Sequence, residues 1–463
     1  MRVPQSAETG KAMVKLSFAG WPDGNVQPSV TDVAVVPRKA VSAVAVTPRQ
    51  RAVWRLEDDW KVNQVVATAN DEKLVVASSR SDKSGRTLRV SIRELTTGRE
   101  VQKLLELPAE KGISHSIQLM ELSPDGHWLA VTVFRDGEGH KNGGDVYFNW
   151  ADRLYLIDLN TAKVAHGIAS DGFTIQRLAF SPNNQVLATA QMARVDRRQE
   201  GKTVMEFNGD VRVWDIATGK LLSTLSADAN QGPTHVVFTP DGKSLAADYS
   251  ISASDHRRHL TRIWNWRERT VRAELSGRSS PRFMNDSLLL AQSDKGELVL
   301  RDLASGRDSS LPFYDYPRNW LMHAQAAADG RSVLCFLNNG RIVVQELPSG
   351  KVRVDERDFS EVNSVRKIAW SYAGSRDGQW FAVSGQVAIP PGRVPATTLS
   401  EDWEEIAPPE IHVWDAVRLR RLATLTGHVG RVADMAFSAG GRWLVSCGTD
   451  RTIRLWDLSD LKP

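Results

Sequence analysis

A short apolar strand that ends in an acidic or amide residue recurs eight times along this chain of 463 residues. Four copies end in Trp214-Asp215, Trp264-Asn265, Trp414-Asp415 and Trp456-Asp457, and four end in Arg93-Glu94, Ile157-Asp158, Arg301-Asp302 and Gln345-Glu346. The interval between successive ends varies from 37 residues (265 to 302) to 69 residues (346 to 415), so the longer units must carry insertions. Such a repeat predicts an array of one supersecondary unit, in which each copy covers the hydrophobic face of its neighbour.

Turn sequences divide each unit into four strands. Ser123-Pro124-Asp125-Gly126 and Thr239-Pro240-Asp241-Gly242 are the clearest turns before a closing strand, and Thr218-Gly219 is typical of the turns after it. Proline presets φ and glycine accepts the left-handed conformation that follows, so the flanking strands pair as hairpins. We therefore expect an all-β chain built from four-stranded units.

The last unit is the most complete. It opens with Gly427-His428, continues with the apolar runs 432–437 and 443–447, and closes with Trp456-Asp457. This unit resembles a WD repeat, the family in which each repeat is one blade of a β-propeller. The resemblance implies a single closed propeller of eight blades, and it assigns a structural polar network to His428, Ser446, Asp450 and Trp456. A ring of seven blades stays open as the alternative, with the unit that closes at 92–95 packed elsewhere.

The final unit needs a fourth strand from elsewhere, because only 463 − 457 = 6 residues follow Asp457. An incomplete blade would expose a strand edge, and circular arrays avoid this by borrowing a strand from the other terminus. The apolar run 52–56 is the first candidate for this strand, and 41–47 is the second. We expect an N-terminal arm over residues 1–50, partly extended, and a propeller over 51–463.

Five insertions are predicted between the second and third strands of their units, at 80–87, 134–153, 191–209, 250–260 and 386–410. In the family that the chain resembles, these connections lie on the same face as the loops between blades, and partners dock there. Aromatic residues dominate the energetics of interfaces. The candidate partner-binding residues are Tyr147, Phe148, Trp150, Arg194, Arg197, Arg198, Arg257, Arg258, Trp403 and Glu404. In the alternative interpretation, the aromatic side chains only pack the insertions onto the propeller.

The insertions differ in charge, from 4 − 3 = +1 over 191–209 to 1 − 5 = −4 over 386–410. A surface of mixed sign suits a protein partner better than a phosphate backbone. The net charge of the whole chain, +4, is also small for its length. Nucleic-acid binding through residues 194–202 and 256–259 is therefore the alternative rather than the main prediction.

Residues that would support catalysis are sparse. Cys335 and Cys447 lie in apolar runs and are predicted to be buried, reduced thiols. His256 and His259 have no third ligand nearby in the sequence and are predicted to lie in a solvated loop. No nucleophile elbow, phosphate-binding glycine loop or zinc-protease motif is present. We expect no enzyme, cofactor or metal site; a metal site in the central channel, built from carboxylates of separate blades, is the alternative that leaves no motif.

The remaining expectations concern partners and location. No window reaches the roughly 18 apolar residues of a membrane span, so we expect no membrane contact and a cytoplasmic address. The phrases Ser-Pro-Asp-Gly and Ala-Thr-Gly-Lys resemble bacterial WD-repeat proteins. That resemblance implies a non-catalytic scaffold or sensor subunit that binds one or more proteins, including an effector carried by a separate chain. By itself the chain is expected to be monomeric.

Overall fold

The computed structural model describes residues 50–461 with gaps at 57–58, 69–70, 84, 111–113, 137–139, 143–144, 148–152, 200–201, 229, 252–257, 277–280, 293–297, 312–320, 327–331, 338–340, 348, 350, 358–365, 376–377, 390–408 and 419. By their contacts, residues 46–463 form one compact unit, separate from residues 1–45. All elements described below belong to the unit 46–463. The described residues contain strands and no helix, and the strands form eight antiparallel sheets.

The sheets are numbered in chain order. Sheet 1 contains β2 (Lys61–Ala67), β3 (Lys73–Asp82), β4 (Gly85–Glu94) and β5 (Glu100–Leu107), and sheet 2 contains β6 (Ser114–Leu122), β7 (Trp128–Asp136), β10 (Arg153–Asp158) and β11 (Lys163–Ala169). Sheet 3 contains β12 (Thr174–Phe180), β13 (Val186–Gln199), β14 (Lys202–Asp215) and β15 (Leu221–Ser226), to which β8 (His140–Asn142) and β9 (Asp145–Tyr147) are added. Sheet 4 contains β16 (Gln231–Phe238), β17 (Ser244–Ile251), β18 (Arg258–Asn265) and β19 (Thr270–Ser276).

The second half of the chain repeats this pattern. Sheet 5 contains β20 (Arg282–Phe283), β21 (Leu288–Gln292), β22 (Leu298–Asp302) and β23 (Asp308–Leu311), and sheet 6 contains β24 (Leu321–Ala326), β25 (Ser332–Leu337), β26 (Arg341–Glu346) and β27 (Val352–Arg357). Sheet 7 contains β28 (Arg366–Gly374), β29 (Trp380–Ile389), β30 (Glu410–Asp415) and β31 (Arg420–Thr426). Sheet 8 contains β32 (Val432–Phe437), β33 (Trp443–Gly448) and β34 (Thr452–Asp457), followed by β1 (Gln50–Arg55).

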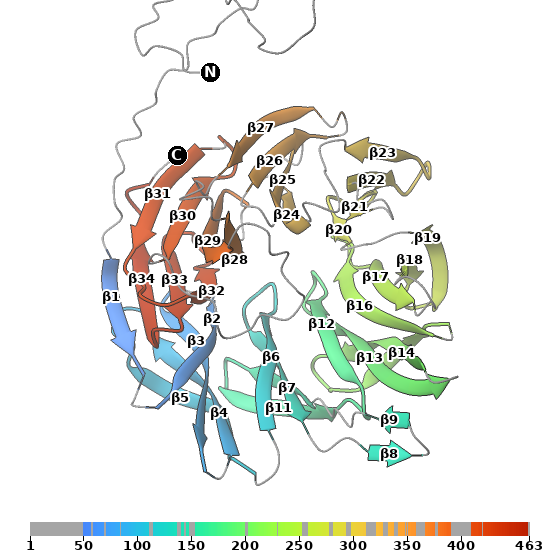
Figure 1. Cartoon of the computed structure of the whole chain (residues 1–463), viewed down its shortest axis with the longest axis horizontal. Helices are drawn as coiled ribbons and strands as arrows, with labels where there is room; N and C mark the ends of the chain where they lie inside the picture. Colours follow the sequence, from blue (N-terminus) through green and yellow to red (C-terminus); the bar gives the residue numbers. More distant parts are fainter. Residues whose placement is uncertain are drawn as a thin grey trace, which may run out of the picture. The chain divides into compact units, whose positions relative to one another are not determined.

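The sheets are arranged around a common centre, with the first strand of each sheet innermost and the fourth at the rim (Figure 1). Sheet 8 obtains its rim strand from the other end of the chain. There β1 pairs antiparallel with β34, from Gln50 opposite Trp456 to Arg55 opposite Thr452. The run 52–56 that the sequence favours for this role therefore overlaps β1, whereas 41–47 lies outside the described residues.

The eight repeated ends found in the sequence all coincide with the ends of third strands. Glu94, Asp158, Asp215, Asn265, Asp302, Glu346, Asp415 and Asp457 are the last residues of β4, β10, β14, β18, β22, β26, β30 and β34. Several of these carboxylates accept hydrogen bonds from the backbone of the turn that follows, as Asp215 does from Thr218 N (2.8 Å) and Asp302 from Ser305 N (2.9 Å). The acidic residue recurs because it stabilises the turn into the fourth strand.

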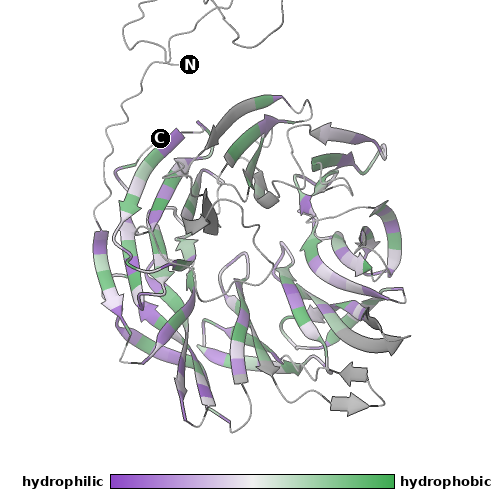
Figure 2. Cartoon of the chain, in the orientation of Figure 1, coloured by the Kyte–Doolittle hydropathy of each residue, from purple (hydrophilic) through white to green (hydrophobic). Residues whose placement is uncertain are grey.

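Apolar side chains fill the space between neighbouring sheets. Eight buried clusters each combine residues of two sheets, and one of them joins Leu74 and Val76 of sheet 1 to Val445 and Leu455 of sheet 8. The middle strands are covered on both faces, so they read as continuous apolar runs rather than as alternating ones. In β33 every residue from Trp443 to Gly448 is buried, and Figure 2 shows apolar segments along the strands of the sheets.

A β-bulge interrupts the first strand of sheets 1, 2, 3, 4, 6, 7 and 8. A bulge adds one residue to its strand and increases the local twist. The residue after the bulge is charged or ionisable in several sheets, as with Arg177, His235 and Asp434. These positions lie on the innermost strands, where the sheets approach one another.

Two expectations about the insertions are wrong. Residues 191–209 are not a loop, because β13 and β14 continue as one long hairpin whose pairing ends with Gln199 opposite Lys202. His259 does not lie in a solvated loop either, because β18 already pairs with β17 at His259 and Ser250. In both places the ladder continues past the apolar core, where charged residues in the sequence suggested a loop. His256 lies outside the described residues, and both cysteines are free and buried as predicted.

Candidate functional site

The four residues of the expected polar network are in contact in sheet 8. Trp456 Nε1 donates to Ser446 Oγ (2.9 Å), and Ser446 Oγ lies 2.8 Å from His428 Nε2. His428 Nδ1 lies 3.0 Å from Asp450 Oδ2, which also accepts from Val429 N (3.0 Å). Because Ser446 accepts from Trp456, its own hydroxyl is free to donate to Nε2, which leaves the proton of His428 on Nδ1 facing Asp450. This network is satisfied within the sheet and serves its architecture.

Burial lowers the pKa of His428 despite the nearby Asp450 carboxylate, so the neutral imidazole is favoured. For Asp450, burial alone would raise the pKa, but hydrogen bonds from Val429 N–H and Thr452 outweigh it and the pKa is lowered. The pair therefore combines a neutral histidine with an ionised aspartate. Such a pair holds the loop 427–431 against the sheet rather than offering a reactive group.

The other tryptophans at third-strand ends differ in their hydrogen-bond partners. Trp214 Nε1 donates to Thr189 Oγ1 (3.0 Å), and Trp264 Nε1 donates to Tyr249 Oη (3.1 Å). Trp414 is 3% exposed, and its buried Nε1 has no acceptor among the described residues. It stacks instead on Phe381, with ring centroids 5.8 Å apart. Among the described residues of these four sheets, the full network is present in sheet 8 alone.

All connections between second and third strands lie at one end of their sheets, because successive strands are antiparallel. We call this the insertion end. Here β8 and β9, which lie between β7 and β10 of sheet 2, join the neighbouring sheet 3. Tyr147 of β9 pairs with Val195 of β13, and Val146 pairs with Asp196. Insertions from two consecutive units therefore form one continuous sheet.

The sequence-predicted contact residues fall into two groups. Tyr147 lies in β9, the residues Arg194, Arg197 and Arg198 lie in β13, and Arg258 begins β18. The pairing of β9 with β13 brings the backbones of these two strands together at the insertion end. Phe148, Trp150, Arg257, Trp403 and Glu404 lie outside the described residues, and their roles stay predictions.

Sequence analysis missed a set of ionisable residues on the innermost strands. Glu121 is exposed to solvent, yet desolvation by the surrounding strands raises its pKa to about 7. Desolvation, followed by the positive charges of Arg177 and Arg282, lowers the pKa of His235 to about 4. Desolvation also raises the pKa of Asp434 to about 6, against hydrogen bonds from the backbone of Val65 and Met435. These residues are single positions on different strands. The common register after a bulge could have indicated His235 and Asp434 but not Glu121, because the bulge of β6 lies between Ile117 and Leu119.

A second pair lies in sheet 4. Asp248 is 1% exposed; its carboxylate accepts from Thr234 Oγ1 (3.0 Å) and lies 3.4 Å from His259 Nδ1. Burial raises the pKa of Asp248. Across the described ranges, no group of three histidine, cysteine or carboxylate residues is arranged to hold a metal ion. Likewise, the described part of the chain contains no helix long and apolar enough to span a bilayer.

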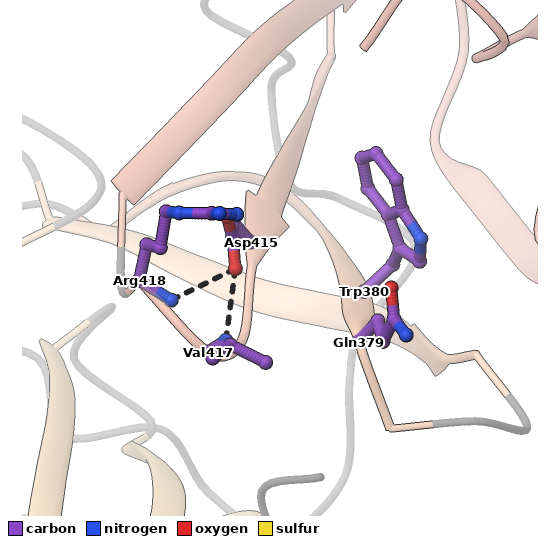
Figure 3. Close-up of a pocket in the computed structure, with 5 residues that line it drawn as sticks. All are labelled: Gln379, Trp380, Asp415, Val417 and Arg418. Carbon is purple, nitrogen blue, oxygen red and sulfur yellow. Dashed lines mark hydrogen bonds and ion pairs between the residues drawn. The ribbon is translucent and has the colours of Figure 1, made fainter. Parts of the chain in front are cut away.

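At the opposite end of sheet 7 lies a pocket of about 250 Å³, lined by Gln379, Trp380, Asp415, Val417 and Arg418. Figure 3 shows Asp415, Val417 and Arg418 on one side and Gln379 and Trp380 on the other. Asp415 accepts from the backbone N–H groups of Val417 (2.9 Å) and Arg418 (2.8 Å). No sequence motif indicated this pocket.

Comparison with known proteins agrees with the repeat and the fold. Residues 419–457 match the family model for the WD domain, G-beta repeat. The structure of the C-terminal WD40 domain of Sif2 superposes with a TM-score of 0.57 at 13% identity and covers 89% of this chain and 98% of that chain. The chain therefore has a β-propeller fold, and one of its repeats, residues 419–457, matches the WD-repeat model.

Among individual proteins, the chain is similar to the nuclear distribution protein PAC1 of Arthroderma benhamiae, with 25% identity over 325 residues, 65% of this chain and 62% of PAC1. It is also similar to the uncharacterized WD repeat-containing protein sll1491 of Synechocystis, with 29% identity over 162 residues, 29% of this chain and 41% of that protein. The chain thus spans less than two thirds of the length of either relative.

Proposed function

We propose that this chain is a non-catalytic scaffold that holds partner proteins on the insertion end of a closed, eight-bladed propeller. The observation that carries the proposal is the continuous sheet made by β8, β9, β13 and β14. Two consecutive units contribute strands to this sheet. Its strands β8 and β9 are additional to the four strands that form the repeated unit. Extensions of this kind offer a partner a larger and better-fixed surface than separate loops do.

Contacts between sheets 1 and 8 support the closed ring. Asp434 of β32 accepts from Val65 N of β2 (3.0 Å), and Asp71 accepts from Gly440 N (3.2 Å). With β1 added, sheet 8 has four strands, as have the other sheets except sheet 3, which has more. The propeller consequently leaves its edges short and at the rim, where they are least open to aggregation.

The partner is proposed to be a protein rather than a nucleic acid, because the insertions carry both signs of charge. The resemblance to bacterial WD-repeat proteins adds an effector on a separate chain as the partner class. A cytoplasmic location and a monomeric state by itself belong to the same proposal. Trp150 and Trp403 are proposed anchors, together with Tyr147, Arg194, Arg197 and Arg198 of the paired strands β9 and β13.

Affinity capture from lysates of the source cells, followed by mass spectrometry, tests this proposal. The variant Arg197→Glu/Arg198→Glu reverses charge at the insertion end. The control Lys163→Glu/Lys243→Glu reverses the same number of charges at the opposite end of sheets 2 and 4. We expect the first variant to lower recovery of the main partners at least fivefold and the second to leave recovery unchanged. Equal recovery with both variants would contradict the proposed face.

Retention on heparin, measured in parallel, addresses the alternative. A protein that binds nucleic acid is held by phosphate contacts, so its retention falls steeply with salt and with loss of basic residues. We expect weak retention that does not differ between the two variants. Strong retention that only Arg197→Glu/Arg198→Glu abolishes would favour a nucleic-acid partner instead.

A further inference from the structure

The pocket of sheet 7 lies at the end of the propeller away from the insertions. The residues that line it come from the connection of β28 to β29 and from the turn between β30 and β31. The insertion 386–410 connects β29 to β30. Because neighbouring strands are antiparallel, the first two connections lie at one end of the sheet and the insertion lies at the other. A ligand in this pocket would therefore not occupy the insertion end.

Arg418 differs from the residue at the same position in sheets 1 to 3. Three residues after the terminal acid, Thr97, Thr161 and Thr218 each donate their hydroxyl to that acid, at 2.6, 3.0 and 2.7 Å. In sheet 7 the same position holds Arg418, whose Nη1 lies 3.2 Å from Asp415 Oδ2. In sheets 4 and 8 this position holds Glu268 and Asp460, so the turn does not require a cation here.

Arg418 and Trp380 line the pocket from its two sides (Figure 3). The Arg418 side chain is 52% exposed, and its contact with the buried Asp415 engages one of its five N–H groups. Across the pocket, Trp380 Nε1 has no hydrogen-bond acceptor among the described residues. Between them Val417, which is 41% exposed, adds apolar surface. Donors above an apolar floor fit a ligand that combines an aliphatic group with an oxygen anion.

The surroundings of the pocket are basic. Arg420 and Arg421 begin β31 and are exposed. In sheet 8, Arg442 is 57% exposed and follows Gly441, where an added Cβ would lie 3.5 Å from the Trp380 ring. The nearby carboxylates are engaged within the fold: Asp415 by its turn, Asp457 by Arg51 Nη2 at 3.0 Å and Arg442 Nη2 at 3.9 Å, and Asp71 by Gly440 N at 3.2 Å. The charge at this end of sheets 7 and 8 therefore complements an acidic partner.

We propose that this pocket docks an acidic peptide segment of a partner protein, with an aliphatic side chain against Trp380 and Val417 and an adjacent carboxylate on Arg418. This second docking surface goes beyond the proposed scaffold face, since it lies at the other end of the sheets. One partner can then be held at each end at the same time.

Fluorescence anisotropy of labelled peptides, with the full chain at low salt, tests the pocket directly. The probe is the peptide Glu-Asp-Leu-Asp-Glu, and two matched peptides replace either its acids by amides (Gln-Asn-Leu-Asn-Gln) or its leucine by alanine (Glu-Asp-Ala-Asp-Glu). We expect the probe to bind with a Kd on the order of 100 μM, which is typical of a small, open site. Each matched peptide should bind at least fivefold more weakly.

Variants then assign the binding to the pocket. Arg418→Gln should weaken binding of the acidic probe at least fivefold. Trp380→Phe removes the indole N–H and keeps an aromatic ring, and it should weaken binding of the probe two- to fivefold. Lys220→Gln removes one positive charge from the corresponding turn of sheet 3 and should leave the affinity unchanged. Thermal melts verify that each variant is folded; in Arg418→Gln, Asp415 keeps its hydrogen bonds from the backbone N–H groups of Val417 and residue 418.

Three results would overturn the proposal: equal binding of the acidic and the amide peptide, unchanged binding by Arg418→Gln, or no binding of the acidic probe. The insertion-end variant Arg197→Glu/Arg198→Glu should bind the probe as the unmodified chain does. Loss of probe binding in that variant would place the peptide at the insertion end and contradict this pocket. Its effect on partner capture is a separate measurement, so the two proposals fail independently.

Discussion

At the scale of single residues, one position decides how three of the third-strand tryptophans are satisfied, whereas Trp264 donates to Tyr249. Ser446, Thr189 and Val383 lie two residues after the strand neighbours of Trp456, Trp214 and Trp414. The first two carry a hydroxyl that accepts from the indole N–H, whereas valine carries none. The fold tolerates the loss because Trp414 keeps its apolar packing with Phe381 and Val383. The polar network is therefore a local addition to a core held by apolar contacts.

This comparison predicts the effect of placing a hydroxyl at 383. In Val383→Thr the new hydroxyl can accept from Trp414, so we expect stability within about 1 kcal/mol of the original or above it. The control Val131→Thr makes the same change at the corresponding position of sheet 2, where no tryptophan is present, and should cost about 1–3 kcal/mol. Both valines are at most 1% exposed. Chemical denaturation measures both, and equal losses would show that the Trp414 N–H is not available.

The pKa of His235, about 4, predicts a pH dependence of stability. In the unfolded chain histidine titrates near 6.5, so between the two values the unfolded state binds a proton that the folded state does not. Stability must then fall as the pH falls through this window, by at most about 1.4 kcal/mol per pH unit. The variant His235→Gln should lose less in melting temperature than the original between pH 7 and pH 5.

Asp434 acts in the opposite sense. Its folded pKa of about 6 lies above the ordinary value of 3.8, so its contribution to stability is lost as the pH rises through 6. Glu121, with its pKa raised to about 7, acts in the same sense as Asp434, so the wild-type profile combines opposing slopes, and the His235 variant isolates the one that His235 contributes. Identical pH profiles for the variant and the wild type would mean that His235 is protonated in the folded chain.

At the scale of elements, β1 is the strand whose contribution can be measured most directly. It provides the rim of sheet 8, and its Ala52 and Trp54 pack with Leu56 against the cluster between sheets 1 and 8. Arg51 also contacts Asp457 (3.0 Å). Without β1, the edge of β34 is exposed.

Two truncations test this contribution. Deletion of residues 1–58 should lower the melting temperature by more than about 10 °C or make the chain insoluble, because a buried interface and a strand ladder are lost together. Deletion of residues 1–45 leaves β1 in place and should change the melting temperature by less than about 2 °C. Similar melts for the two truncated chains would exclude a structural role for β1.

Sequence reasoning succeeded where local chemistry determines the element and failed where the partner is distant. The strand ends at Asp158 or Asp302 were found without a tryptophan, because the acid and the turn after it are local signals. The pairing of Tyr147 with Val195 joins two insertions 48 residues apart (195 − 147), and neither contains a signal for the other. His235 and the pocket around Arg418 likewise depend on residues from separate strands, so spacing along the chain could not reveal them.

At the scale of the whole molecule, a closed ring behaves differently from an open row of the same repeats. In an open row, stability is a sum over neighbouring units, and the units at the ends unfold first. Closure gives the first and last sheets the same number of neighbours as any other. The cluster of Leu74, Val76, Val445 and Leu455 is the interface that distinguishes the two cases.

Hydrogen exchange with two matched variants separates them. Leu74→Ala opens the interface of sheets 1 and 8, and Leu187→Ala opens that of sheets 2 and 3; both leucines are fully buried. Each should cost about 2–5 kcal/mol. If the propeller is closed, both variants lower amide protection in all eight sheets to a similar degree, because either cut removes the cooperativity of the whole ring. In an open row, Leu74→Ala would release only β1 to β5 and β32 to β34, while sheets 3 to 6 kept the protection of the unmodified chain. That localised loss is the pattern that would contradict a closed ring.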